Sequence, residues 1–137
     1  MKKFTLAVAL FAMSLGVNAQ SQIDLPITWD DTANVDYTTI AFEGGTSAHV
    51  VDPTDANNMV LQFTKPTGAQ PWAGVTLGNP TLANPIPFTD TDKIISVRVH
   101  SEAAGMPVML KAEVAGNPGI FAEAQDTTTV AGGWEIL

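Results

Sequence analysis

The 137-residue sequence contains no cysteine. This absence excludes disulfide bonds, thiol catalysis, cysteine-ligated zinc and iron–sulfur clusters. A secreted or intracellular chain of this size without disulfides must be held together by a packed apolar core.

Positive charge is also scarce, because six Lys and Arg face fourteen Asp and Glu, for a net charge of −8. Nucleic-acid surfaces need clustered Lys and Arg to neutralise phosphates, and anionic membranes attract basic segments. We therefore expect no nucleic-acid partner and no membrane partner. Polyanionic polysaccharides are disfavoured as partners for the same reason.

The first 19 residues have the pattern of a secretory signal peptide. Lys2 and Lys3 precede an apolar stretch over residues 4–17, and Val17-Asn18-Ala19 offers small residues for cleavage. The stretch is shorter than the roughly 20 residues that span a bilayer, which disfavours a membrane anchor. We expect a secreted, extracellular or cell-surface module over residues 20–137, whose net charge without the two lysines is −10.

The mature part shows no helical periodicity and many turn signals. Gly and Pro residues recur at intervals of roughly 8–12 residues between short runs rich in Val, Ile, Thr and aromatics, which is typical of β-sandwiches. The predicted fold class is therefore all-β, an antiparallel β-sandwich. Strands are expected near residues 23–29, 35–42, 47–51, 58–64, 72–77, 93–101, 107–115, 120–129 and 134–137.

Three of these strands, at 93–101, 107–115 and 120–129, alternate apolar and polar residues and predict a meander with one aliphatic face. A turn near Asn117-Pro118 would place Lys111 opposite Glu123 and Met109 opposite Gln125. A turn near residues 102–106 would place Arg98 opposite Glu113. The polar face of this meander would carry Arg98, His100, Lys111, Glu113, Glu123 and Gln125.

The last residues, Trp134 to Leu137, have the pattern of an opening strand. Natural sheets avoid an exposed apolar edge, so we expect the sandwich to be C-terminally truncated in this sequence. The alternative is a genuine terminus in which Trp134 packs as a plug.

Several segments together resemble a known group of secreted domains. They are Ile23-Asp24-Leu25-Pro26-Ile27-Thr28-Trp29-Asp30, Asp36-Tyr37, Phe42-Glu43-Gly44-Gly45, Val51-Asp52-Pro53, Pro71-Trp72-Ala73-Gly74-Val75, Pro85-Ile86-Pro87-Phe88, Val97-Arg98-Val99-His100-Ser101, Gly105-Met106-Pro107-Val108 and the run from Thr128 to Glu135. The overall pattern resembles the jelly-roll carbohydrate-binding modules of secreted bacterial polysaccharidases, laminarinase-associated and galactose-binding-like. The resemblance covers nearly all of the mature chain.

The resemblance implies a binding module that accompanies a covalently linked catalytic or sorting domain and brings a polysaccharide-degrading enzyme to its glycan. It also implies a structural calcium near the Phe42-Glu43-Gly44 stretch. Calcium prefers six to eight oxygen ligands, and Glu43 with Asp30 are the candidate metal residues. The alternative for these acidic residues is ordinary Asp turn chemistry.

Carbohydrate binding needs exposed aromatic faces and a few polar groups. Among the tryptophans, Trp72 is the best candidate because it follows Pro71 in a Gly/Pro-rich loop, and Tyr37 is a weaker one. Core packing is the alternative for each aromatic ring. On the polar face, Arg98, His100, Lys111 and Glu113 are candidate contacts for sugar hydroxyls, and a solvated outer sheet face is the alternative.

Catalysis by this segment is not expected. Glu113 and Glu123 are two carboxylates, but their predicted basic neighbours would keep both ionised, whereas a general acid needs a raised pKa. No Gly-x-Ser-x-Gly or His-Glu-x-x-His motif occurs. The rival hypotheses are a non-catalytic structural or adhesive surface domain, and the leading segment of a glycoside hydrolase or lyase.

Overall fold

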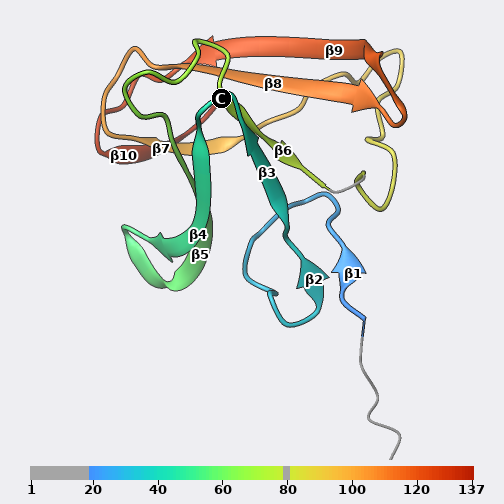
Figure 1. Ribbon diagram of the computed structural model, residues 1–137, viewed down its shortest axis with the longest axis horizontal. Helices are drawn as coiled ribbons and strands as arrows, with labels where there is room; N and C mark the ends of the chain where they lie inside the picture. Colours follow the sequence, from blue (N-terminus) through green and yellow to red (C-terminus); the bar gives the residue numbers. More distant parts are fainter. Residues whose placement is uncertain (1–18, 79–80) are drawn as a thin grey trace, which may run out of the picture.

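The computed structural model describes residues 19–78 and 81–137, and this part of the chain is all-β, without a helix (Figure 1). The all-β prediction is therefore confirmed. The ten strands are β1 (Ser21–Gln22), β2 (Val35–Asp36), β3 (Thr39–Phe42), β4 (Thr46–Asp52), β5 (Asp55–Thr64), β6 (Gly74–Leu77), β7 (Arg98–Ser101), β8 (Pro107–Val114), β9 (Asn117–Thr127) and β10 (Gly133–Ile136).

The strands pair two by two, in five sheets of two strands each within the described residues. The pairs β3–β6, β4–β5, β7–β10 and β8–β9 are antiparallel, and β1–β2 is parallel. In Figure 1 the long β8–β9 hairpin lies along one side of the molecule, and the other pairs lie beneath it.

The β8–β9 hairpin confirms the period-two prediction. Lys111 pairs with Glu123 and Met109 with Gln125, as the alternation predicts. The turn differs in detail, because it falls at Ala115-Gly116 and Val114 pairs with Asn117. Residues 118–120 of β9 have no partner in the register, which shifts between Glu113 and Val114 of β8. Pro118 lies at this irregularity, where a strand tolerates proline.

The predicted pairing of residues 93–101 with 107–115 is wrong. β7 begins only at Arg98, and it pairs with β10, so that Arg98 lies opposite Ile136 and not opposite Glu113. Alternation fixes which side chains share a face but does not specify the neighbouring strand. The polar face predicted from the three strands is therefore divided between two separate pairs, β7–β10 and β8–β9.

The predicted strand at 23–29 is also wrong, since the only strand near it is β1 (Ser21–Gln22). Asp24 and Pro26 interrupt this run, and the Asp24 carboxylate accepts hydrogen bonds from the Leu25 amide and from Asn84. The Ala83 amide donates to the Ile23 carbonyl at 2.9 Å, which ties the segment to a loop 60 residues later. Ile23 is 1% exposed as a result.

The packed interior is small. Among the described residues the buried side chains include Ile23, Tyr37, Asp52 and Thr128, whereas many large apolar side chains remain exposed. Thr128 is 2% exposed and joins the end of β9 to the turn between β7 and β8, because its hydroxyl accepts from the Met106 amide and donates to the Ala103 carbonyl. Residues 19–78 and 81–137 hold no helix long and apolar enough to cross a membrane.

Candidate functional site

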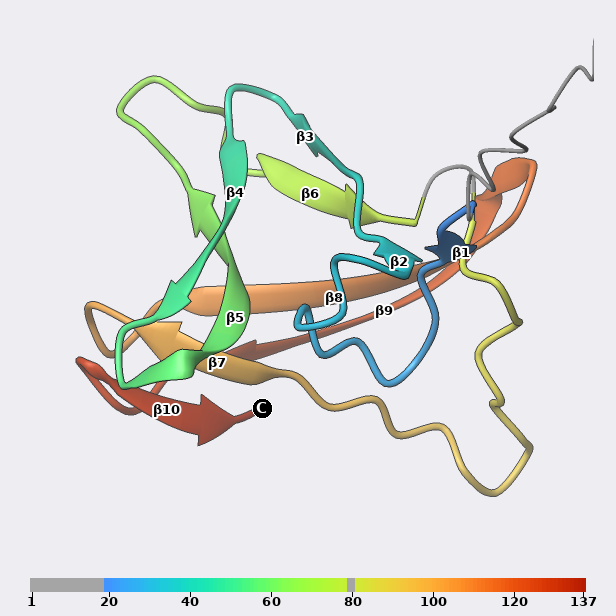
Figure 2. The ribbon, with the colours of Figure 1, turned by 90° about the horizontal axis from the view of Figure 1, so that it is seen from below.

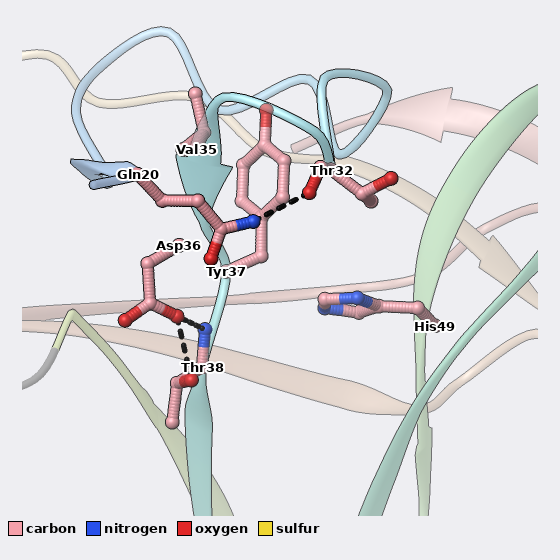
Figure 3. Close-up of a pocket in the computed structure, with 7 residues that line it drawn as sticks. All are labelled: Gln20, Thr32, Val35, Asp36, Tyr37, Thr38 and His49. Carbon is pink, nitrogen blue, oxygen red and sulfur yellow. Dashed lines mark hydrogen bonds between the residues drawn. The ribbon is translucent and has the colours of Figure 1, made fainter. Parts of the chain in front are cut away.

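A shallow hollow of about 230 Å³ lies where the start of β3 approaches β4 (Figure 3). Figure 3 shows polar side chains gathered beside the Tyr37 ring, with the His49 imidazole across from them. The hollow is lined by Gln20, Thr32, Val35, Asp36, Tyr37, Thr38 and His49.

Three aromatic rings form the wall of this hollow and the packing behind it. The ring centroids of Trp29 and Tyr37 are 5.2 Å apart, those of Trp29 and His49 are 5.2 Å apart, and Tyr37 meets His49 edge-on at 5.9 Å. Such tilted and edge-to-face pairs are favourable arrangements of aromatic quadrupoles. Tyr37 is 7% exposed, so the packing of this cluster covers most of the residue.

Trp29 adopts an unusual backbone conformation with φ of 68°. For a residue with a Cβ this left-handed region costs roughly 1–2 kcal/mol. The ring contacts of the indole with Tyr37 and His49 are favourable and offset this cost.

Asp36 supplies the negative charge at the hollow. Its Oδ1 accepts hydrogen bonds from the Thr38 hydroxyl at 2.6 Å and the Thr38 amide at 2.9 Å, as Figure 3 shows. These two bonds hold the pKa of Asp36 below its ordinary value of 3.8, so the carboxylate is ionised at neutral pH. Within the described residues, Oδ2 accepts no hydrogen bond and is available to a ligand.

Gln20 and Thr32 supply amide and hydroxyl groups on the opposite rim. The Gln20 side-chain amide donates to the Thr32 carbonyl at 2.6 Å, which joins the residue before β1 to the loop before β2. This bond uses an N–H of the amide and leaves its oxygen free to accept from a hydroxyl group. The hollow therefore combines aromatic side chains, one carboxylate and neutral hydrogen-bonding groups.

Trp72 lies outside this hollow. Its side chain is 64% exposed, in agreement with the predicted accessible ring, and it follows Pro71, whose carbonyl accepts from Lys65 at 2.6 Å. Trp72 precedes the end of β6 that pairs with Phe42, whereas Tyr37 precedes the other end of β3. The two residues therefore lie beyond opposite ends of the β3–β6 pair.

Arg98 and His100 lie on β7 and contact Trp134 of β10. The Arg98 guanidinium lies 4.4 Å above the Trp134 ring, and the His100 ring is 5.4 Å from it. The Trp134 face is thus covered by a cation–π contact. Neither residue lines the hollow.

Lys111 and Glu113 lie on the outer face of the β8–β9 hairpin. Their side chains form an ion pair at 2.7 Å, and the Lys111 ammonium lies 4.2 Å from the centroid of the Phe121 ring. Both side chains are about 40% exposed, so the pair is solvated and contributes roughly 1 kcal/mol or less. These contacts correspond to a solvated sheet face with routine ion pairing.

The two candidate calcium residues, Asp30 and Glu43, have different local roles in the fold. The Asp30 carboxylate accepts from the Met59 amide at 2.9 Å, and Glu43 occupies a left-handed turn with φ of 56° after β3. In the described part of the chain, no three His, Cys, Asp or Glu side chains are grouped closely enough to hold an ion. A calcium site at Glu43 and Asp30 stays a prediction.

Sequence reasoning identified one residue of the hollow, Tyr37, and missed the others. Gln20, Thr32 and Thr38 are polar residues outside the strands, and such residues are common in all-β proteins. The signal that could have pointed to them is the run Asp36-Tyr37-Thr38, where an aromatic ring is flanked by a carboxylate and a hydroxyl.

Comparisons with protein-family models, with curated proteins and with solved structures found no match.

Proposed function

We propose that this chain is a secreted carbohydrate-binding module that keeps an attached polysaccharide-degrading enzyme close to its glycan. The observation that carries the proposal is the hollow beside Tyr37 and His49, because it joins aromatic side chains to carboxylate, amide and hydroxyl groups. Sugar rings present C–H faces to aromatic groups and hydroxyls to polar ones, so this combination matches their chemistry.

The size of the hollow also supports the proposal. Pockets for drug-sized ligands measure roughly 300–1,000 Å³. A hollow of about 230 Å³ is smaller and is open on one side, which suits a single sugar ring of a longer chain. Binding of one ring is weak, and an attached enzyme gains from it through an increased effective concentration at the polysaccharide.

Catalysis at this hollow is not part of the proposal. Glycoside hydrolysis generally uses two carboxyl groups that flank the scissile bond. Asp36 is the one carboxylate among the residues that line the hollow, and its pKa is lowered where a general acid needs a raised pKa.

A second candidate function, a structural or adhesive surface domain, is supported by a different observation. Fourteen large hydrophobic side chains are exposed in the part of the chain that the structure describes, including Ile94 at 82% and Ile136 at 74%. Exposed apolar surface of this extent is typical of protein–protein contact sites. Such a domain would pack against a neighbour and bind no sugar.

Affinity electrophoresis of the full chain in gels containing laminarin, agar, xylan, alginate or chitosan tests the proposal. We expect at least one glycan to retard the protein. His49→Ala should weaken that retardation about two- to tenfold, the range for loss of an aromatic contact. His100→Ala is the matched control, because His100 contacts Trp134 outside the hollow, and it should leave retardation unchanged.

Two results would contradict the proposal. Absence of retardation by every glycan favours the structural or adhesive domain. Retardation that survives His49→Ala but is lost in Trp72→Ala or Arg98→Ala would place sugar binding away from the hollow.

A further inference from the structure

The outer edge of strand β9 has no backbone partner in the described part of the chain. β9 pairs only with β8 there, and none of its residues makes a backbone hydrogen bond with another segment. All eleven residues of β9 are exposed, and Figure 1 shows the strand on the outer side of β8, away from the other strands. An unpaired edge of this length presents a row of N–H and C=O groups with which a further strand can pair.

A hydrogen bond at the end of the hairpin shows which of these groups face outward. In an antiparallel pair, every second residue directs its N–H and C=O to the partner strand, and the residues between direct theirs to the opposite edge. Thr128 extends the register of β9 by one residue, and its amide donates to the Met106 carbonyl at 2.9 Å. Counting back along β9 in steps of two, the backbone groups that face the open edge are those of Phe121, Glu123 and Gln125.

The charged side chains of β9 are all negative. They are Glu123 and Asp126, and the strand holds no Lys, Arg or His. Lys111 lies opposite Glu123 but is paired with Glu113, so Glu123 takes part in no ion pair in the described part of the chain. A second copy of the chain would bring the same carboxylates and a net charge of −8 to this edge. Like charges across a ladder destabilise it and opposite charges stabilise it, so charge favours a basic strand over a second copy.

A second hollow, of about 110 Å³, lies beside β9, and we call it the hairpin hollow. Six of its eight lining residues are apolar, and these are Phe88, Ile95, Leu110, Ala112, Ala122 and Ala124. The other two, Lys93 and Glu123, carry opposite charges. Pockets for drug-sized ligands measure roughly 300–1,000 Å³, so the hairpin hollow suits a single aliphatic side chain. When a strand is added to a sheet edge, backbone bonds supply affinity and pockets for alternate side chains supply specificity.

We propose that the open edge of β9 binds an extended segment of another polypeptide, in which basic and apolar residues alternate, by strand addition. The segment bonds to the outward backbone groups of Phe121, Glu123 and Gln125. A basic side chain opposite Glu123 lies on the same face as that carboxylate, and the apolar residue next to it points to the other face, at the hairpin hollow. This inference goes beyond the proposed function and makes no use of the hollow beside Tyr37.

Hydrogen exchange of the full chain, measured by NMR with and without the capped peptide Val-Lys-Val-Lys-Val-Lys-Val, tests the proposal. In the free chain we expect slow exchange at Ala122 and Ala124, whose amides face β8, and fast exchange at the three outward amides. At a peptide concentration about ten times its Kd, exchange at the outward amides should slow about tenfold, because the bound fraction protects them.

The charge preference is tested with the same peptide carrying glutamate in place of lysine. It should bind at least roughly two- to fivefold more weakly, the range for one opposite-charge pair across a ladder. Glu123→Gln should weaken binding of the lysine peptide by a similar factor. Asp55→Asn is the matched control, because it removes the same charge at the start of β5 and should leave binding unchanged.

A proline in each strand tests which edge is used. Gln125→Pro should abolish peptide binding, because it removes an outward N–H that β8 does not use. Met109→Pro is the matched control, since Met109 pairs with Gln125 and its N–H faces the other edge of the hairpin. Circular dichroism checks that both variants keep the fold.

Three results would overturn the inference. The first is unchanged exchange at the outward amides with saturating lysine peptide, and the second is equal affinity for the lysine and glutamate peptides. The third is slow exchange at the outward amides of the free chain. If that exchange becomes fast on dilution, a second copy occupies the edge, and if it stays slow, the edge is already covered. None of these results alters the test of carbohydrate binding at the hollow beside Tyr37.

Discussion

At the scale of single residues, Asp52 connects the β4–β5 hairpin to β10. Asp52 is the last residue of β4 and is 4% exposed. Oδ1 accepts from the Thr54 amide at 2.7 Å, the Thr54 hydroxyl at 2.8 Å and the Trp134 indole at 3.1 Å, and Oδ2 accepts from Asn58 at 2.8 Å. Figure 2 shows the tip of the β4–β5 hairpin beside the start of β10, where this contact is made.

The pH dependence of stability follows from these bonds. Burial favours the neutral form of Asp52, but the bonds from Thr54, Asn58 and Trp134 outweigh it and hold the pKa well below its ordinary value of 3.8. A carboxyl group with a lowered pKa in the folded state stabilises the fold above its unfolded pKa and loses this contribution as the pH falls. We expect the free energy of unfolding to decrease below about pH 4, measured by urea denaturation between pH 7 and 2.

Asp52→Ala should lower the midpoint of thermal unfolding and flatten this acid dependence, because it removes the acceptor of four donors and only the Trp134 indole keeps a second acceptor, the Thr54 hydroxyl. Asp55→Ala is the control, since Asp55 is exposed and, among the residues that the structure describes, its carboxylate accepts only from the Asn57 amide. Circular dichroism melting curves measure both variants. Equal midpoints for the two variants would show that the contact with Trp134 does not stabilise the fold.

At the scale of elements, period-two alternation predicted the β8–β9 register but not the partner of β7. The hairpin is local, and a short turn brings the two strands together in one register. β7 and β10 are separated by the whole hairpin, so their pairing depends on contacts such as Arg98 over Trp134. The site was predictable only at Tyr37, because its other groups converge from three separate segments.

The register can be tested by an engineered disulfide in this cysteine-free chain. Met109 and Gln125 are directly paired on the outer face, so Met109→Cys with Gln125→Cys should oxidise readily. Met109→Cys with Ala124→Cys is the control, because Ala124 pairs with Leu110 and faces the opposite side. Free-thiol titration after mild oxidation measures both, and equal oxidation of the two pairs would contradict the register.

The turn after β6 requires glycine. Gly78 has φ of 80°, and a Cβ there would lie 2.7 Å from the Thr81 backbone. Gly68 has φ of 93° with open space around it, so Gly68→Ala should cost only the roughly 1–2 kcal/mol of the left-handed conformation. Gly78→Ala should cost more than this control in urea denaturation. An equal cost would mean that the Thr81 backbone moves away freely.

At the scale of the whole molecule, a small interior coexists with much exposed apolar surface. Five two-stranded sheets bury few side chains completely, whereas Phe121, Met109 and Ile120 are each at least half exposed. The net charge of −8 keeps chains apart at low ionic strength.

This balance predicts self-association that increases with salt, because screening weakens the repulsion between chains while the apolar surface remains. Light scattering coupled to size-exclusion chromatography at 20 and 500 mM salt should show a larger average mass at high salt. Binding of the dye ANS should accompany it. A monomer at both salt concentrations that binds no ANS would contradict the exposure of this surface.

The most direct test of the account is a ¹H–¹⁵N NMR titration of the chain with the glycan that retards it most. If the hollow is the carbohydrate site, the amide signals of Asp36, Tyr37, Thr38 and His49 should shift together and saturably. Those of Arg98, His100 and Lys111 should stay in place. Saturable shifts confined to Trp72 or to β7 and β8, with the hollow unchanged, would contradict the account.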